Sequence, residues 1–102
     1  MSQHIGIKII DQKNQIINEY DLNLSKLVHV FKQVDNGNYP LVYSIDEYDN
    51  TWFNRSQCEI AIKELEEMVN NEKFIDVKND IINLSKILSS IERYNYVLFI
   101  GD

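Results

Sequence analysis

Cys58, the single cysteine of this 102-residue chain, is the first residue that could act as a nucleophile. It lies near the expected start of a helix, where the positive end of the helix dipole lowers the pKa of a thiol. The same residue, however, falls on the apolar stripe of that helix, and neither histidine is close to it in sequence. A buried structural cysteine is therefore the favoured interpretation.

Asp46 and Asp49 form the second candidate, because paired carboxylates can exchange protons with a substrate or, together with Asn50, bind a hard cation. Their spacing does not fit the EF-hand loop, which needs ligands at positions one, three and five, glycine at six and glutamate at twelve. No glycine-rich phosphate loop accompanies them, and the two histidines and one cysteine do not have zinc-site spacing. We therefore predict no catalytic residue, no metal and no cofactor, in a protein that is not an enzyme.

The stretch from Tyr43 to Asn54 has the composition of a recognition surface. Tyr48 and Trp52 belong to the residue types that dominate interface hot spots, since they bury a large area and keep a polar group. The carboxylates between them can accept paired hydrogen bonds from arginine. The competing interpretation makes Trp52 and Phe53 core residues and 46–50 a polar turn. We expect Phe53 in the core, and both interpretations remain open for Trp52.

The net charge of −6 comes from one segment. Residues 46–72 hold eight acids against Arg55 and Lys63, whereas acids and bases balance in the rest of the chain. This excess could simply keep a small protein in solution. It could also form a docking surface for a basic partner, whose approach it would accelerate. Direct binding of nucleic acid is disfavoured, because phosphates require a basic patch.

Length and composition indicate a single domain over residues 1–102. The chain is 44% hydrophobic with one proline and three glycines, which suits one modest core and leaves no room for a linker. Its longest apolar runs are four or five residues, far short of the roughly 20 that span a bilayer, and its N-terminus lacks the features of a signal peptide. With one cysteine, these features favour the reducing cytoplasm and no membrane partner.

Apolar periodicity predicts the elements that position these residues. Alternating isoleucines from Ile5 to Ile9 and the β-rich run from Gln15 to Tyr20 indicate an N-terminal hairpin. Helical spacing from Leu24 to Val34 indicates the first helix, which Asn23 can cap at its start and Asn36-Gly37 can close.

The second half of the chain is expected to contain strands at Leu41 to Ile45, after Pro40, and at Thr51 to Phe53. The following helix is expected to start at Asn54 or Ser56, where Ser56 to Glu59 fits a capping box. Its apolar stripe comprises Cys58, Ala61, Ile62, Leu65, Met68 and Val69, and the acids Glu59, Glu64, Glu66 and Glu67 fall mainly outside it.

A further helix from Val77 to Arg93 and a final strand at Tyr96 to Ile100 complete the pattern. The strand is continuously apolar, which predicts that both of its faces are covered. The predicted fold class is therefore α+β. It consists of a mostly antiparallel sheet, made from the N-terminal hairpin, a middle strand and the C-terminal strand, with about three helices packed on it.

Two stretches resemble a family of small acidic bacterial proteins. Residues 46–54 resemble a D-x-Y-x-D-T-x-F-N element that precedes a helix, and residues 96–102 resemble a terminal strand ending F-x-G-D. The overall format is similar to immunity proteins of polymorphic toxin and contact-dependent growth inhibition systems. Glu47 and Asp49 stand where the family often has proline and glycine, so this loop is more acidic. The resemblance implies a cytoplasmic protein that blocks a cognate toxin domain.

We therefore expect an immunity protein whose acidic surface occludes the active site of a basic toxin domain. An RNase is the favoured toxin, because nucleases expose lysine and arginine to bind phosphate. The expected toxin-binding residues are Asp46, Glu47, Tyr48, Asp49, Asn50, Trp52, Glu59, Glu66 and Glu67. The alternatives are an adaptor or regulatory module whose partner is not a toxin, and a small enzyme that uses Cys58 or the Asp46 and Asp49 carboxylates.

Overall fold

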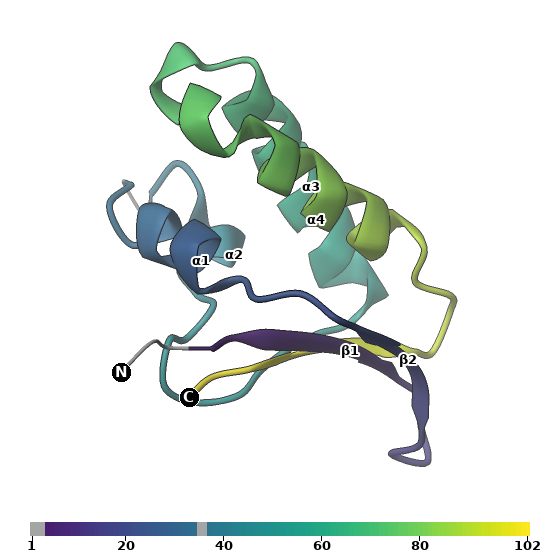
Figure 1. Cartoon of the computed structure of the whole chain (residues 1–102). Helices are drawn as coiled ribbons and strands as arrows, with labels where there is room; N and C mark the ends of the chain where they lie inside the picture. Colours follow the sequence, from purple (N-terminus) through teal and green to yellow (C-terminus); the bar gives the residue numbers. More distant parts are fainter. Residues whose placement is uncertain (1–3, 35–36) are drawn as a thin grey trace.

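The computed structural model describes residues 4–34 and 37–102, in which an antiparallel sheet carries the helices on one of its faces (Figure 1). The elements in chain order are β1 (Gly6–Ile10), β2 (Ile16–Tyr20), α1 (Ser25–Phe31), α2 (Pro40–Tyr43), β3 (Thr51–Phe53), α3 (Arg55–Val69), the 3-10 helix η1 (Glu72–Val77), α4 (Lys78–Ser89) and β4 (Tyr96–Ile100). The predicted α+β class, with its N-terminal hairpin and C-terminal strand in one sheet, is confirmed.

The C-terminal strand β4 lies inside the sheet, whose strand order is β2-β1-β4-β3. Ile7 pairs with Phe99, and Phe53 pairs with Val97, so these four side chains project from the same face. All four are buried in the hydrophobic core beneath the helices.

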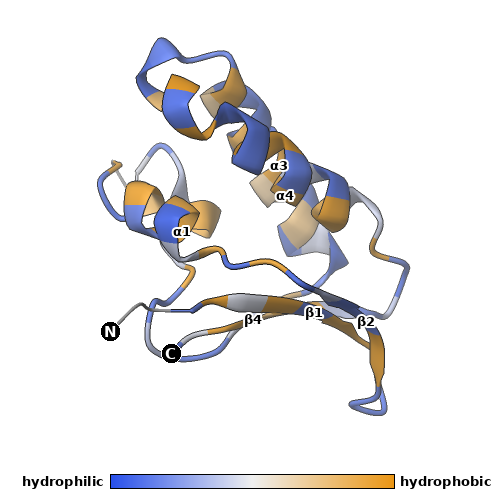
Figure 2. Ribbon diagram, in the orientation of Figure 1, coloured by the Kyte–Doolittle hydropathy of each residue, from blue (hydrophilic) through white to orange (hydrophobic). Residues whose placement is uncertain are grey.

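The helices α3 and α4 pack against each other above this face (Figure 1). They contribute Cys58, Ala61, Leu65 and Met68 from α3, and Ile81, Leu84 and Leu88 from α4. In Figure 2 apolar and polar colours alternate along both helices, as expected for helices that bury one side. Among the described residues, no helix has the length and apolar character needed to cross a membrane.

The predicted strand from Leu41 to Ile45 is wrong, because this segment begins with the short helix α2. Pro40 occupies the start of that helix, where its fixed φ suits the helix and its missing N–H costs no hydrogen bond. The Glu64 carboxylate of α3 accepts hydrogen bonds from the backbone N–H groups of Leu41 (3.1 Å) and Val42 (3.0 Å). A contact distant in sequence therefore stabilises a local structure that the apolar pattern does not indicate.

Three smaller predictions have different outcomes. The last helix ends at Ser89 and not at Arg93, although Ile91 beyond it is still buried. The predicted close of the first helix includes Asn36, which lies outside the described residues. The prediction that both faces of β4 are covered holds for its central residues, because Val97, Leu98 and Phe99 are all buried. The helices, however, cover only the face from which Val97 and Phe99 project (Figure 1).

Candidate functional site

Residues 46–50, here called the acidic loop, fold around one carboxylate. Asp46 Oδ1 accepts hydrogen bonds from the backbone N–H groups of Tyr48 (2.8 Å) and Asp49 (3.1 Å), and the Asp46 N–H donates to Thr51 Oγ1 (2.9 Å). Asp49 Oδ1 accepts from the N–H of Asn50 at 2.8 Å. Bonds of this type stabilise Asx turns. Both carboxylates therefore shape the loop, and each still has lone pairs with which to meet a partner.

The acidic loop is fixed to the end of β4. The Gly101 N–H donates to the carbonyl oxygen of Asp49 at 3.2 Å, and the Asp102 N–H donates to that of Glu47 at 3.0 Å. A Cβ atom on Gly101 would lie 2.5 Å from both the N and O atoms of Asp49, so this approach requires glycine. In Figure 1 the loop passes beside the C-terminus and below the strands, away from the helices. Residues 46–54 and 96–102 are therefore in direct contact.

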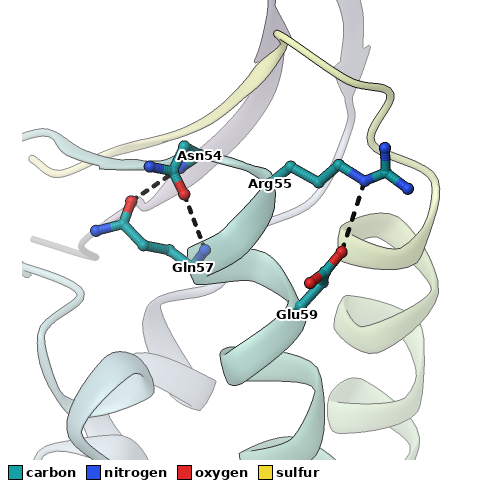
Figure 3. Close-up of polar contacts among 4 residues, drawn as sticks. All are labelled: Asn54, Arg55, Gln57 and Glu59. Atoms are coloured by element: carbon teal, nitrogen blue, oxygen red, sulfur yellow. Dashed lines mark hydrogen bonds and ion pairs between the residues drawn. The ribbon is translucent and has the colours of Figure 1, made fainter.

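The residues that follow the loop build the scaffold. Phe53 is 2% exposed and its ring centroid lies 5.2 Å from that of Phe99, which confirms its predicted place in the core. The side-chain oxygens of Asn54 and Gln57 each accept the backbone N–H of the other at 2.9 Å, forming the capping box of α3 (Figure 3). The predicted capping box at Ser56 is therefore wrong, because Ser56 already lies inside the helix that Asn54 starts.

The aromatic residues Tyr48 and Trp52 are both accessible. Tyr48 in the acidic loop is 76% exposed, and Trp52 is 45% exposed. The Trp52 ring meets the Tyr96 ring edge to face, with 6.5 Å between centroids. Trp52 pairs with Leu98 across β3 and β4 and projects from the face of the sheet opposite to Phe53. Of the two interpretations left open for Trp52, the structure supports the surface residue.

The remaining expected toxin-binding residues, Glu59, Glu66 and Glu67, are exposed on α3. Glu59 Oε1 lies 3.6 Å from Arg55 Nε in an ion pair (Figure 3), and Glu67 Oε1 accepts a hydrogen bond from the Tyr39 hydroxyl at 3.5 Å. The helical layer lies on the face of the sheet opposite to the side chain of Trp52. The expected residues are therefore divided among the acidic loop, the uncovered face and α3, and they do not form one surface.

Glu64 is structural, although it belongs to the acidic segment. It is 7% exposed and holds the start of α2 through the N–H groups of Leu41 and Val42. Burial raises the pKa of its carboxyl, and the two hydrogen bonds partly oppose that shift. The prediction that Glu64 falls outside the buried side of the helix is wrong, because its partners come from a helix that the sequence pattern did not predict.

The catalytic hypothesis based on Cys58 is not supported. The side chain is fully buried, and desolvation, with the nearby charge of Glu59, raises the pKa of its thiol to about 12. The thiol therefore stays protonated at neutral pH and lacks the thiolate that a nucleophile requires. Within residues 4–34 and 37–102, no three His, Cys, Asp or Glu side chains are grouped so as to hold a metal ion.

A groove that the sequence did not predict lies at the end of β3 opposite the acidic loop. It has a volume of about 350 Å³, and its lining includes Arg55, Glu59, Arg93, Tyr94 and Tyr96. Glu59 pairs with Arg55, which among the described residues leaves Arg93 as the uncompensated positive charge of the groove. We call it the arginine groove, since it contains the only two arginines of the chain. Because the chain has only two arginines, the sequence could have singled them out as candidate binding residues, but only the fold brings them together.

The chain thus presents two accessible surfaces of opposite charge at the two ends of β3, together with a buried cysteine and a buried glutamate. Comparison with known proteins adds nothing to this description: no family model, curated protein or solved structure matches the chain.

Proposed function

We propose that this protein is a cytoplasmic immunity protein, which binds a basic toxin domain and blocks the toxin's active site. The observation that carries the proposal is the acidic loop, an exposed cluster of carboxylates around Tyr48 that is already folded in the free chain. A loop ordered before binding loses less conformational entropy on association, so more of its contact energy appears as affinity.

The chemistry of the loop favours a basic partner. Asp46 and Asp49 can accept bidentate hydrogen bonds from arginine without giving up their bonds within the loop, because a carboxylate offers about four acceptor positions. Tyr48 supplies a large exposed ring between them. An RNase domain is the favoured partner, because its cationic phosphate site would be complementary to this cluster.

The acids of α3 have a different proposed role. Glu59, Glu66 and Glu67 lie on α3, outside the acidic loop, and act through their field by accelerating the encounter with a basic domain. Direct contact is assigned to the acidic loop, with Tyr48 as its anchor and Trp52 at the adjoining face.

The first test is co-expression of this chain with the C-terminal domain encoded by the neighbouring gene. Rescue from growth arrest supports immunity. Binding of that domain without any toxicity supports the adaptor alternative. If the domain arrests growth and this chain neither binds nor rescues, the proposal is wrong.

The second test measures affinity of the purified pair with loop variants. Tyr48→Ala should weaken binding by about 30-fold, as expected for a hot-spot aromatic. The combined change Asp46→Asn, Glu47→Gln and Asp49→Asn keeps side-chain acceptors for the loop but removes its charge, and should lower the association rate and its salt dependence. Glu72→Gln, an exposed site outside the loop, is the matched control. Unchanged affinity and salt dependence in the loop variants would show that the toxin binds elsewhere.

A further inference from the structure

The face of the sheet that carries no helix is apolar. Strand registers place Lys8, Ile10, Leu98, Tyr96 and Trp52 on this face, which we call the open face. Ile10 and Leu98 are buried, so its accessible apolar area comes from Tyr96, Trp52 and Ile16. At the bulge in β2, Ile16 pairs with Ile10, and Ile16 and Ile17 are 52% and 53% exposed. Figure 2 shows apolar colour at the hairpin end of β2.

Such a face is unusual for an uncovered antiparallel sheet, which normally carries polar residues toward water. On the open face the charged pair is Lys8 with Glu19, joined at 3.1 Å across β1 and β2. Exposed apolar patches of this kind mark interaction surfaces.

The two ends of the open face carry opposite charges. The acidic loop leads directly into β3, and the arginine groove lies at the other end of the same strand, with Tyr96 shared between the groove and the open face. In the groove, Arg55 pairs with Glu59, whereas Arg93 lies over the Tyr94 ring with 4.9 Å between Cζ and the centroid. Among the described residues, Arg93 makes no ion pair, so a carboxylate from outside the chain can approach it.

The backbone at the arginine groove is strained. Tyr94 has a φ of 72°, a left-handed conformation that costs a residue with a side chain roughly 1 kcal/mol or more. The other non-glycine residue with a positive φ is Asn14, a residue type that tolerates this conformation in a turn. Tyr94 is mostly exposed, so core packing does not compensate for its strain. Strain kept at an exposed aromatic residue points to a binding role.

We propose that a second copy of this chain covers the open face in the free protein. The arrangement is a two-fold dimer whose axis lies in the plane of the interface and runs across the strands. This rotation exchanges the two ends of β3, so the acidic loop of each copy faces the arginine groove of the other. An isologous contact needs a surface that complements itself, and an apolar centre between ends of opposite charge meets that condition.

Charge disfavours the other simple packing of the two open faces. A two-fold axis parallel to the strands would put acidic loop on acidic loop and arginine groove on arginine groove. Like charges placed together cost free energy, so this arrangement is disfavoured. The Lys8–Glu19 pair neutralises itself and lies toward the β2 side, away from both charged ends.

The size of the face sets the expected affinity. Four strands about 4.8 Å apart and five residues of about 3.4 Å each give a footprint of roughly 300 Å². Standard interfaces bury about 800 Å² per partner, so the acidic loop and the arginine groove must add to the buried area, and the interface is still smaller than standard. Interfaces below the standard size belong to weak, transient complexes, so we expect a weak dimer with a dissociation constant on the order of micromolar or above. A toxin that binds the acidic loop would compete with the second copy, but the dimer does not depend on the proposed function.

The test is sedimentation equilibrium of the purified chain alone, over a concentration range that brackets the micromolar region. The wild-type chain should change from monomer to dimer. Trp52→Lys places two like charges near the axis and should weaken the dimer by at least about 30-fold. Ile75→Lys is the matched control, because Ile75 is also a large apolar residue at the surface, 68% exposed, but lies on η1 in the helical layer.

A charge exchange tests the orientation without touching the core. Arg93→Glu and Asp49→Arg should each weaken the dimer by about tenfold, and the double variant should recover most of that loss because opposite charges again face each other. Lys78→Glu and Asp76→Arg, both exposed in the helical layer, should leave the dimer unchanged. Circular dichroism confirms that each variant is folded. A wild-type chain that stays monomeric, a dimer that survives Trp52→Lys, or a double variant no better than the single ones overturns the proposal.

Discussion

The two faces of the sheet are both apolar, but helices cover only one of them (Figure 1). Phe53 and Trp52, neighbours in β3, illustrate the difference: Phe53 contacts Phe99 in the core, and Trp52 contacts Tyr96 at the surface. The apolar character of a strand residue therefore does not show whether its side chain lies on the helix-covered face or on the open face. The covered face should determine stability, and the open face should determine association.

The strongest test of this contrast replaces each of the two neighbours with alanine. Phe53→Ala leaves a cavity in the core and should lower the free energy of unfolding by about 3–5 kcal/mol. Trp52→Ala removes a half-exposed ring and should cost less than about 1 kcal/mol. Denaturant unfolding, at a concentration where the chain is monomeric, measures both. Similar losses for the two variants would show that the open face is part of the folding core.

A second prediction concerns the carboxylate on the covered side. Glu64→Ala leaves the N–H groups of Leu41 and Val42 without their acceptor, and should lower the free energy of unfolding by roughly 2 kcal/mol. The exposed Glu66→Ala on the same helix should change it by less than about 0.5 kcal/mol. Equal effects would contradict the role of Glu64 in holding α2.

The contribution of Glu64 to the free energy of unfolding should depend on pH in a defined direction. Because burial raises the pKa of Glu64 above its ordinary value of 4.5, its contribution is fully present below that value and is lost as pH rises through the folded-state pKa. The wild-type chain should therefore gain stability relative to Glu64→Gln as pH falls from neutral toward 4.5. A difference that is flat or shrinks on acidification would show that hydrogen bonding outweighs burial.

A third prediction addresses the acidic loop at one end of the open face. Gly101→Ala places a methyl group against the backbone of Asp49 and should cost about 1–3 kcal/mol. Gly6→Ala is the matched control, because its added Cβ would meet only His4 Cε1, at 3.9 Å. Hydrogen exchange at the amides of Tyr48 and Asp49 should accelerate in Gly101→Ala alone. Unchanged exchange there would mean that the loop does not depend on β4.

Periodicity was sufficient for elements whose burial is regular. Most of the stripe from Cys58 to Met68 and the alternating isoleucines from Ile5 to Ile9 are buried as predicted, because their local spacing determines which side is buried. Ile62 is only partly buried. The segment from Leu41 to Ile45 was mispredicted because its helix depends on the Glu64 carboxylate, which lies far along the chain. Short apolar runs are compatible with either structure, and only tertiary contacts distinguish them.

The candidate site was predicted in composition but not in arrangement. The sequence indicated the acidic loop and its aromatic residues, and left the position of Trp52 open. It placed Glu59 and the loop in one surface, although the sheet order and the helical layer separate them. The arginine groove depends on the start of α3 meeting the turn before β4, a long-range pairing with no local signal.

The smallest predicted change in the free energy of unfolding is an increase, and it concerns Tyr94 in the arginine groove, at the other end of the open face. Tyr94→Gly removes the strain of a positive φ, which stabilises the fold. It also removes the contact with Arg93 and increases the entropy of the unfolded chain, and both of these changes destabilise the fold. The net result should be a chain more stable by about 0.5 kcal/mol. Asn14→Gly, at the other positive φ, should have an effect close to zero, since Asn already tolerates this conformation.

Measuring both properties of Tyr94→Gly separates strain that serves folding from strain that serves binding. Denaturant unfolding of the monomer should show the gain in stability, and sedimentation of the same variant should show a weaker dimer. A loss of more than about 1 kcal/mol in unfolding would instead place Tyr94 among the residues that hold the fold. The arginine groove at the end of the open face would then be required for folding as well as for association, as the covered face is required for folding.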